Sequence, residues 1–278
     1  MFAIFRNYIL SLFDVLCFYT KIIGLFPFIY KICRKIRNND IIMREIGERN
    51  IGILLAGGTS SRFYHNISKQ LYKYNDKPLF LYSLDSMINY LSDIIVVTNS
   101  KCYNEINELL HDYKTQIQKN KNSKNSNKIN INFVIVINDI NCRLESIDCG
   151  LKYIKNNIDE KTKIKNIIIH DSARPFVNQE YINEIIDKTK YYSQYCLKLT
   201  NGLMDEKYNT LDREKYVELC SPLCINYELG LFIFENFISK KNRNVHEFID
   251  ILKIYKIPIQ LIYGKYRNLR KITYIDDL

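Results

Sequence analysis

The residues with the clearest chemical potential lie between Ile51 and Gln70, where the chain reads IGILLAGGTSSRFYHNISKQ. An apolar strand runs into a Gly-rich loop, and two cations, Arg62 and Lys69, come after it. Glycines let the backbone approach phosphate groups closely, and exposed backbone N–H groups form an anion-binding nest. The segment therefore predicts a nucleoside triphosphate site, although surface cations after an ordinary strand-to-helix turn are the alternative. It is neither a P-loop nor a dinucleotide fingerprint, because Gly-Lys-Ser/Thr and Gly-x-Gly-x-x-Gly are absent.

A second candidate group stands at His170 and Asp171, within the segment IIIHDSARPFV. Open α/β sheets bind ligands beyond the carboxyl ends of their strands, which favours a functional role for Asp171. An Asp at this place can also simply cap the next turn. His170 could act as a base, but the favoured interpretation is that it orients the loop.

The elements that must position these groups can be deduced from the hydrophobic pattern. Apolar runs predict strands at 51–55, 94–97, 131–137 and 166–170, and helical spacing predicts helices at 78–90, 103–113 and 145–155. Alternating strands and helices are typical of an α/β fold with a doubly wound, mostly parallel sheet. The loops at 57–62 and 170–175 both come after strand ends, so we expect them to share one crevice.

Composition narrows the class of partner. The chain has 278 residues, of which 47% are hydrophobic and 25% charged, as expected for a globular protein with a sizeable core. A formal net charge of +10 points to anionic partners. No nucleic-acid-binding motif is evident, so we expect no nucleic-acid partner. The eight cysteines form no CxxC pairs, which predicts reduced thiols rather than a zinc site or a disulfide framework.

The N-terminal region, residues 1–49, has a different character. Residues 9–32 form an apolar run interrupted by Asp14, Lys21 and Pro27, and a basic cluster lies next to it at 31–37. Charges near the middle weaken a transmembrane interpretation. We expect a leader or signal anchor that delivers the chain to a plastid-like organelle, with possible membrane contact through residues 9–32. An amphipathic helix packed on the domain is the alternative, and the chain would then be membrane-anchored or cytoplasmic.

The folded domain is predicted to span residues 50–278. Within it, residues 118–130 read QKNKNSKNSNKIN, with almost nothing to bury. We expect a solvated, low-complexity loop insertion there.

The pairing of LLAGGTSSRF…SKQ with IIIHDSARPFV resembles the 2-C-methyl-D-erythritol 4-phosphate cytidylyltransferase family. Three further segments resemble family motifs in the same order: RLESIDCGL at 143–151, DREKYVELCSPLCINYEL at 212–229 and GKYRNLRKITYIDDL at 264–278. The resemblance implies a Rossmann-like nucleotidyltransferase with a protruding dimer arm at about 198–220. Such enzymes join CTP to a sugar-alcohol phosphate and release pyrophosphate, with Mg²⁺ or another divalent cation as cofactor.

The resemblance also implies roles for individual residues. The catalytic cations would be Arg62, Lys69 and Lys271. The nucleotide-binding residues would be Ala56, Gly57, Gly58, Ser146 and Asp171, and Asp171 would also place the Mg²⁺. The acceptor-binding residues would be Arg174, Arg213 and Ser221, with Arg213 reaching the substrate of a partner subunit in a homodimer.

The chain departs from the family pattern at several places, and the acceptor half and the dimer arm are the less well kept parts. Asp139-Ile140 replaces a Gly-Gly pair, and the segment KLTNGLM at 198–204 lacks a clear match for a substrate-binding Thr. Ser221-Pro222-Leu223 replaces Thr-Pro-Gln, and Val245-His246-Glu247 replaces Thr-Asp-Glu. These departures keep two alternatives open: a cytidylyltransferase that acts on ribitol 5-phosphate or another pentitol phosphate, and a degenerate member that binds nucleotide without turnover.

Overall fold

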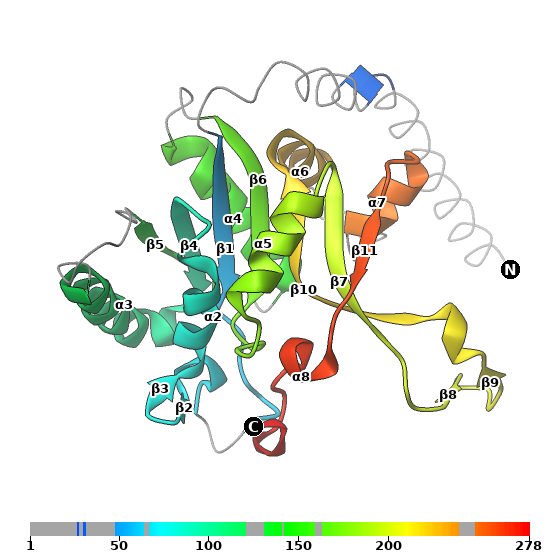
Figure 1. Cartoon of the computed structure of the whole chain (residues 1–278), viewed down its shortest axis with the longest axis horizontal. Helices are drawn as coiled ribbons and strands as arrows, with labels where there is room; N and C mark the ends of the chain where they lie inside the picture. The colour runs from blue at the N-terminus through cyan, green and yellow to red at the C-terminus, as the bar shows by residue number, and fades with distance from the viewer. Residues whose placement is uncertain are drawn as a thin grey trace, which may run out of the picture.

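The computed structural model describes residues 48–63, 67–120, 131–140, 142–158, 163–238 and 248–278, together with Pro27, Tyr30 and Lys31. This part of the chain is built around one seven-stranded sheet (Figure 1). In spatial order its strands are β11 (Gln260–Tyr263), β7 (Tyr192–Lys198), β10 (Val217–Asn226), β6 (Ile164–Asp171), β1 (Arg49–Leu55), β4 (Asp93–Thr98) and β5 (Asn132–Ile137).

The sheet is mixed but mostly parallel, as the alternation of strands and helices predicted. β1 is parallel to both β4 and β6, β4 is parallel to β5, and β11 is parallel to β7. β10 alone runs antiparallel to both of its neighbours, β6 and β7. The predicted α/β class and doubly wound sheet are confirmed.

Helices cover both faces of this sheet. One face packs against α2 (Leu79–Met87), α3 (Ser100–Asn120) and α5 (Gln179–Lys188), and the other against α4 (Arg143–Asn157), α6 (Tyr227–Ile233) and α7 (Phe248–Ile254). Side chains therefore alternate between two cores: Ile51 and Ile53 of β1 join one and Leu54 the other. Burial on both faces explains why the strands read as continuous apolar runs.

Helix α3 is longer than the sequence pattern predicted. It continues to Asn120 and so includes the first three residues of the expected loop 118–130. Ile117 is partly buried against the core, which supplies a packing reason for the extra turn. Residues 121–130 lie outside the described part of the chain.

An arm projects from the sheet between β7 and β10 (Figure 1). Its two short strands, β8 (Leu203–Met204) and β9 (Thr210–Leu211), pair with each other, and the short 3₁₀ turn η2 (Arg213–Lys215) leads back into β10. Asp205 closes the tip by accepting backbone hydrogen bonds from Lys207 and Asn209. Met204 and Tyr208 are exposed on the arm.

The chain ends against the carboxyl edge of the sheet. After the short helix α8 (Tyr266–Leu269), the backbone N–H of Ile272 donates to the carbonyl of Ala173 (2.8 Å), and the turn η4 (Ile275–Asp277) completes the described chain. Further elements near this edge are η1 (Lys69–Leu71), β2 (Lys73–Tyr74) and β3 (Lys77–Pro78); η3 (Phe234–Ile238) extends α6.

Among the residues that the structure describes, no helix has both the length and the apolar character needed to cross a bilayer. Of the predicted leader, 1–49, only Pro27, Tyr30, Lys31, Glu48 and Arg49 are among those residues, and Arg49 already belongs to β1. The rest of the leader, including most of the apolar run at 9–32, lies outside them.

Candidate active site

A cavity of about 320 Å³ opens at the carboxyl ends of β1 and β6. Five separate parts of the chain line it: the Gly-rich loop, the start of η1, the N-terminal end of α4, the segment after β6, and the C-terminal segment around Lys271. Its lining includes most of the residues named from the sequence, namely Gly57, Gly58, Arg62, Lys69, Ser146, Asp171 and Lys271. Cavities of this size hold small ligands, so the expected shared crevice exists.

The Gly-rich loop is held close to the end of β4. A Cβ atom on Gly57 would lie 3.3 Å from the backbone of Thr98, which is tighter than ordinary contact. Asn99 Nδ2 donates to the Gly57 carbonyl (2.9 Å), which fixes this approach. Gly58 has nothing within 4 Å of its Cβ position and faces open space. Ala56 is buried behind the loop, where its N–H bonds the Val97 carbonyl, so it shapes the loop without lining the cavity.

Lys69 is brought back to this loop by Ser60. Ser60 has φ 56°, in the left-handed region, and its hydroxyl accepts the Lys69 backbone N–H at 2.8 Å. Gln70 is buried next to it and donates to Cys102 Sγ of α3. These bonds place the Lys69 side chain in the cavity with Arg62.

The electrostatics of Lys69 show that the cavity suits an anion. Burial lowers its pKa to about 8, and the nearby charges of Lys271 and Arg62 contribute to the same shift. Asp171 and Asp277 act in the opposite direction but do not outweigh them. A bound phosphate would restore the pKa, because an opposite charge favours the protonated amine. The three cations are therefore preorganised around a position that needs negative charge.

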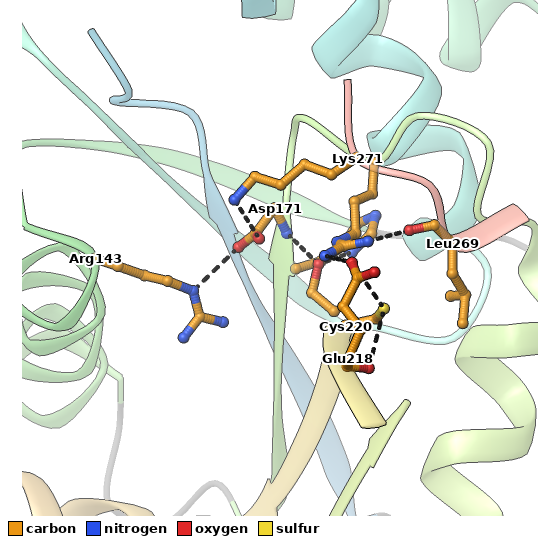
Figure 2. A network of polar contacts seen from close by, with 9 residues as sticks. Arg143, Asp171, Glu218, Cys220, Leu269 and Lys271 are labelled. Carbon is orange, nitrogen blue, oxygen red and sulfur yellow. Dashed lines mark hydrogen bonds and ion pairs between the residues drawn. The ribbon is translucent and has the colours of Figure 1, made fainter. Parts of the chain in front are cut away.

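Asp171 is the carboxylate of this cluster (Figure 2). Its Oδ1 lies 3.4 Å from Arg143 Nε and its Oδ2 lies 3.6 Å from Lys271 Nζ. Burial would raise the pKa of this carboxyl, but Arg143, Lys271 and Arg174 outweigh burial and hold the pKa below its usual range. Asp171 is therefore ionised at neutral pH.

The donor atoms of the cavity fit a Mg²⁺ ion that is held jointly by one protein carboxylate and by the phosphates of the substrate. No group of three or more His, Cys, Asp or Glu side chains gathers to hold a metal within the described ranges. Mg²⁺ is commonly held by one or two carboxylates together with substrate phosphates rather than by an all-protein cage. Asp171, ionised and lining the cavity, could supply that single carboxylate.

His170 lies directly beneath the cavity and does not line it. It is fully buried, and its Nδ1 lies 3.2 Å from Ser221 Oγ. Burial lowers its pKa to about 4, although Asp171 pulls in the opposite direction. The imidazole is therefore neutral at pH 7. It contacts the hydroxyl of Ser221, which also accepts the backbone N–H of Asp171. This geometry favours the orienting role over the base.

The three residues expected to bind the acceptor lie outside the cavity. Ser221 is buried and accepts the Asp171 backbone N–H at 3.0 Å. Arg174 is also buried and directs its guanidinium to the Leu269 carbonyl and to Glu218. Arg213 is exposed on the arm, where it donates to the Thr200 carbonyl. The structure thus assembles the nucleotide half of the expected site and leaves the acceptor half apart from it.

Some lining residues were not predicted from the sequence. The most important is Arg143, which begins α4 and pairs with Asp171. The sequence did offer a signal for Arg143, because it is the first residue of the RLESIDCGL segment. Only Ser146 of that segment was expected to bind the nucleotide. Other lining residues to which the sequence analysis gave no role include Thr59, Ser61, Gln70, Cys142 and Thr273.

A doubly wound sheet with a Gly-rich loop, three converging cations and one carboxylate at its carboxyl edge defines a nucleotidyltransferase. The family model for 2-C-methyl-D-erythritol 4-phosphate cytidylyltransferase (IspD) matches residues 51–278. The chain belongs to this family and is a cytidylyltransferase.

Curated relatives agree with this assignment. The chain is 27% identical over 239 residues to 2-C-methyl-D-erythritol 4-phosphate cytidylyltransferase of Clostridium botulinum (strain ATCC 19397 / Type A), covering 83% of this chain and 94% of that one. It is 29% identical over 233 residues to the bifunctional enzyme IspD/IspF of Pelagibacter ubique, covering 81% of this chain. The match spans only 55% of that bifunctional relative.

Solved structures share the fold. 4-Diphosphocytidyl-2C-methyl-D-erythritol synthase from Anaerococcus prevotii superposes with a TM-score of 0.62 at 17% identity, covering 83% of this chain and 92% of that one. The bifunctional IspDF of Campylobacter jejuni gives a TM-score of 0.56 at 21% identity, covering 83% of this chain and 53% of that one.

Proposed function

We propose that this protein transfers the cytidylyl group of CTP to 2-C-methyl-D-erythritol 4-phosphate and releases pyrophosphate. The observation that carries the proposal is the convergence of Arg62, Lys69 and Lys271 on the cavity that Asp171 also lines. Three cations around one carboxylate suit a triphosphate with a bound divalent cation better than they suit a neutral ligand.

The proposed reaction does not require a general base. An oxygen of the acceptor's phosphate attacks the α-phosphorus of CTP, and the bond to the bridging oxygen of the leaving pyrophosphate breaks. The nucleophile is already an anion, so catalysis reduces to positioning and to neutralising the charge of the transition state. A neutral, buried His170 is compatible with this reaction, because no proton has to be removed from the attacking oxygen.

Each charged residue of the cavity has a role in this reaction. Lys69 and Arg62, on the Gly-rich side, would hold the triphosphate, and Lys271 would face them from the C-terminal segment. Asp171 would hold Mg²⁺, which when bound neutralises phosphate charge. Gly58, with open space above its Cα, would let the phosphates pass close to the backbone.

We also propose a homodimer that completes the acceptor site. Arg213 is exposed on an arm that projects from the sheet, and Met204 and Tyr208 are exposed on the same arm (Figure 1). A homodimer contact that covers these side chains would remove apolar surface from water, which favours association. In a dimer, the arm of one subunit would bring its Arg213 to the acceptor phosphate at the other.

The acceptor is the part of the proposal that most needs a test. The departures at 198–204 and at Ser221-Pro222-Leu223 favour a second candidate, ribitol 5-phosphate or another pentitol phosphate. We propose further that residues 1–49 direct the chain to a plastid-like organelle, on the basis of the interrupted apolar run and its basic tail.

A matched panel tests the acceptor. The purified protein is incubated with Mg²⁺ and each of CTP, ATP, GTP and UTP against three acceptors: methylerythritol phosphate, ribitol 5-phosphate and erythritol 4-phosphate. Released pyrophosphate is the readout. We expect turnover with CTP and methylerythritol phosphate to exceed every other pair. Preference for ribitol 5-phosphate would select the second candidate, and equal turnover with all four nucleotides would contradict a cytidylyltransferase.

A further inference from the structure

The guanidinium of Arg174 is turned away from the nucleotide cavity. The residue is only 4% exposed, and the cavity lining includes its neighbour Ala173 but not Arg174 itself. Its Nη1 donates to the Leu269 carbonyl, and its Nη2 lies 3.5 Å from Glu218 Oε1. Its Nε is buried without a hydrogen-bond partner. Two of the three guanidinium nitrogens, Nη1 and Nη2, are thus directed to protein partners.

The bond to Leu269 matters because Leu269 lies close to a catalytic cation in the chain. Lys271 is two residues further on, and its ammonium enters the cavity beside Asp171 (Figure 2). On the other side of Lys271, the Ile272 N–H donates to the Ala173 carbonyl at 2.8 Å. The dipeptide Ala173-Arg174 therefore anchors the backbone both before and after Lys271.

Glu218 links this anchor to the arm. It is the second residue of β10, the strand that follows the η2 turn at the end of the arm. In the sheet it lies opposite Leu197 of the neighbouring strand β7. Its side chain is 47% exposed, so the pair with Arg174 is open to water on one side. The Cys220 thiol contacts the Glu218 carbonyl at 3.7 Å from the same strand.

We propose that Arg174 is a positioning residue for Lys271, oriented by Glu218, and not a ligand of the acceptor. The planar fork of Arg can bridge a carbonyl and a carboxylate at once, which a Lys ammonium cannot reproduce with the same geometry. Two contacts, Glu218 to Arg174 and Arg174 to the Leu269 carbonyl, thus connect the start of β10 to the backbone two residues before Lys271. The inference deepens the proposed function and rests on it where Lys271 is assigned to catalysis.

The two possible roles of Arg174 predict opposite results for Glu218→Gln. If Arg174 bound the acceptor phosphate, loss of the competing carboxylate would free its charge and lower the acceptor KM. If Arg174 positions Lys271, the anchor loosens: kcat falls by about three- to fivefold, the size expected for an ion pair half open to water, and the acceptor KM stays unchanged. Glu108→Gln, the same substitution at an exposed position of α3 that neither belongs to the arm nor lines the cavity, is the matched control and should change neither value.

Arg174 variants sharpen the distinction. Arg174→Met should lower kcat by roughly 10²-fold, because small displacements of a catalytic group are costly. Arg174→Lys keeps the charge but should not rescue kcat. The double variant Arg174→Met/Glu218→Gln should be no slower than Arg174→Met alone, since Glu218 acts through Arg174. A lowered acceptor KM in Glu218→Gln, or rescue by Arg174→Lys, would overturn the proposal.

A second measurement needs no turnover. Hydrogen exchange in the peptide that covers residues 269–273 reports directly on the anchored backbone. In Glu218→Gln this peptide should exchange several-fold faster than in wild type, and in Glu108→Gln it should exchange at the wild-type rate. Unchanged exchange in Glu218→Gln would refute the anchoring even if no acceptor were found. Faster exchange with an inactive wild type would instead count against the proposed function alone.

Discussion

The carboxylate of Asp171 lies 3.6 Å from the ammonium of Lys271, and this pair joins the end of β6 to the C-terminal segment. Arg143, at the start of α4, approaches the other oxygen of the same carboxylate at 3.4 Å. In the free protein the two cations keep Asp171 ionised. With a triphosphate bound, Arg143 and Lys271 could contact phosphate, and Asp171 could hold a divalent cation, which would supply further positive charge. The free site thus already carries the charges that the reaction requires.

The cations should dominate the rate. We expect Lys69→Ala and Lys271→Ala each to lower kcat/KM by about 10²-fold or more, as removal of other preorganised electrostatic groups does. Arg62→Lys should also be damaging, because Lys lacks the planar fork that binds phosphate with two hydrogen bonds. Steady-state kinetics with CTP, together with circular dichroism to verify folding, gives the answer.

Lys73→Ala is the matched control for these cations. Lys73 is exposed on β2 only a few residues beyond Lys69, and it is not among the residues that line the cavity. Its replacement should leave kcat/KM within about twofold, as expected for a surface change. Near-wild-type activity in a Lys69, Lys271 or Arg62 variant would remove that residue from the site.

The lowered pKa of Lys69 should be visible in the pH profile. Its pKa in the free protein is about 8, and only the protonated amine attracts phosphate. As the pH rises through 8, kcat/KM for CTP should therefore fall, by about tenfold for each further pH unit. Lys69→Arg keeps its charge over this range and should remove the alkaline limb. An identical limb in Lys69→Arg would assign the titration to another group.

His170 should make folding stability depend on pH. Its pKa is about 4 in the folded protein and near 6.5 when unfolded, so the unfolded chain binds more protons between these values. Stability is therefore complete above pH 6.5 and is lost as the pH falls toward 4. Between pH 7.5 and pH 5 the loss from this group should be about 2 kcal/mol.

Urea unfolding at several pH values measures this dependence. His170→Gln retains a polar side chain for Ser221 but does not titrate, so its slope between pH 6.5 and pH 4 should be smaller than that of wild type. The ionised Asp171, whose pKa is lowered in the folded protein, adds a loss of its own below about pH 5, and it does so in wild type and variant alike. Equal slopes in wild type and variant would show that His170 is not the group responsible.

Much of the architecture could be predicted from the sequence because strands buried on both faces leave long apolar runs. Residues 51–55, 94–97 and 166–170 are such runs, and each lies within a parallel strand of the structure. β7 and β10 were not predicted, since their Cys, Ser, Tyr and Gln residues break the apolar signal. Once strand ends were known, topology alone placed Asp171 beside the Gly-rich loop.

The partners of individual side chains could not be predicted in the same way. The position of Lys271 came from the family resemblance, because nothing local in GKYRNLRKITYIDDL tells Lys271 from Arg267 or Arg270. The direction of Arg174 depends on a carbonyl at Leu269 and a carboxylate at Glu218, both distant in sequence. Such contacts are set by tertiary packing, which no pattern within IIIHDSARPFV records.

Removal of the N-terminal region should leave the enzyme intact. β1 begins at Arg49, and Glu48 pairs with Lys165 at 2.8 Å, so a chain that starts at Glu48 keeps the first strand and its ion pair. We expect full specific activity from it.

A fluorescent protein fused after residues 1–49 should be delivered to the organelle, and the same fusion with Lys31, Arg34, Lys35 and Arg37 replaced by Gln should not. A diffuse cytosolic signal from the first fusion would refute targeting.

The central claim is that the acceptor's phosphate attacks the α-phosphorus of CTP in the cavity that Lys69, Lys271 and Asp171 line. The most direct test tracks CTP labelled with ³²P at the α-position, incubated with the protein, Mg²⁺ and methylerythritol phosphate. The account predicts that the label moves into a diphosphate-linked cytidine product in a one-to-one ratio with released pyrophosphate. It also predicts that Lys69→Ala slows both signals by about 10²-fold or more while Lys73→Ala leaves them within about twofold of wild type. Label that stays in CTP, or that appears only as CMP, would contradict the account.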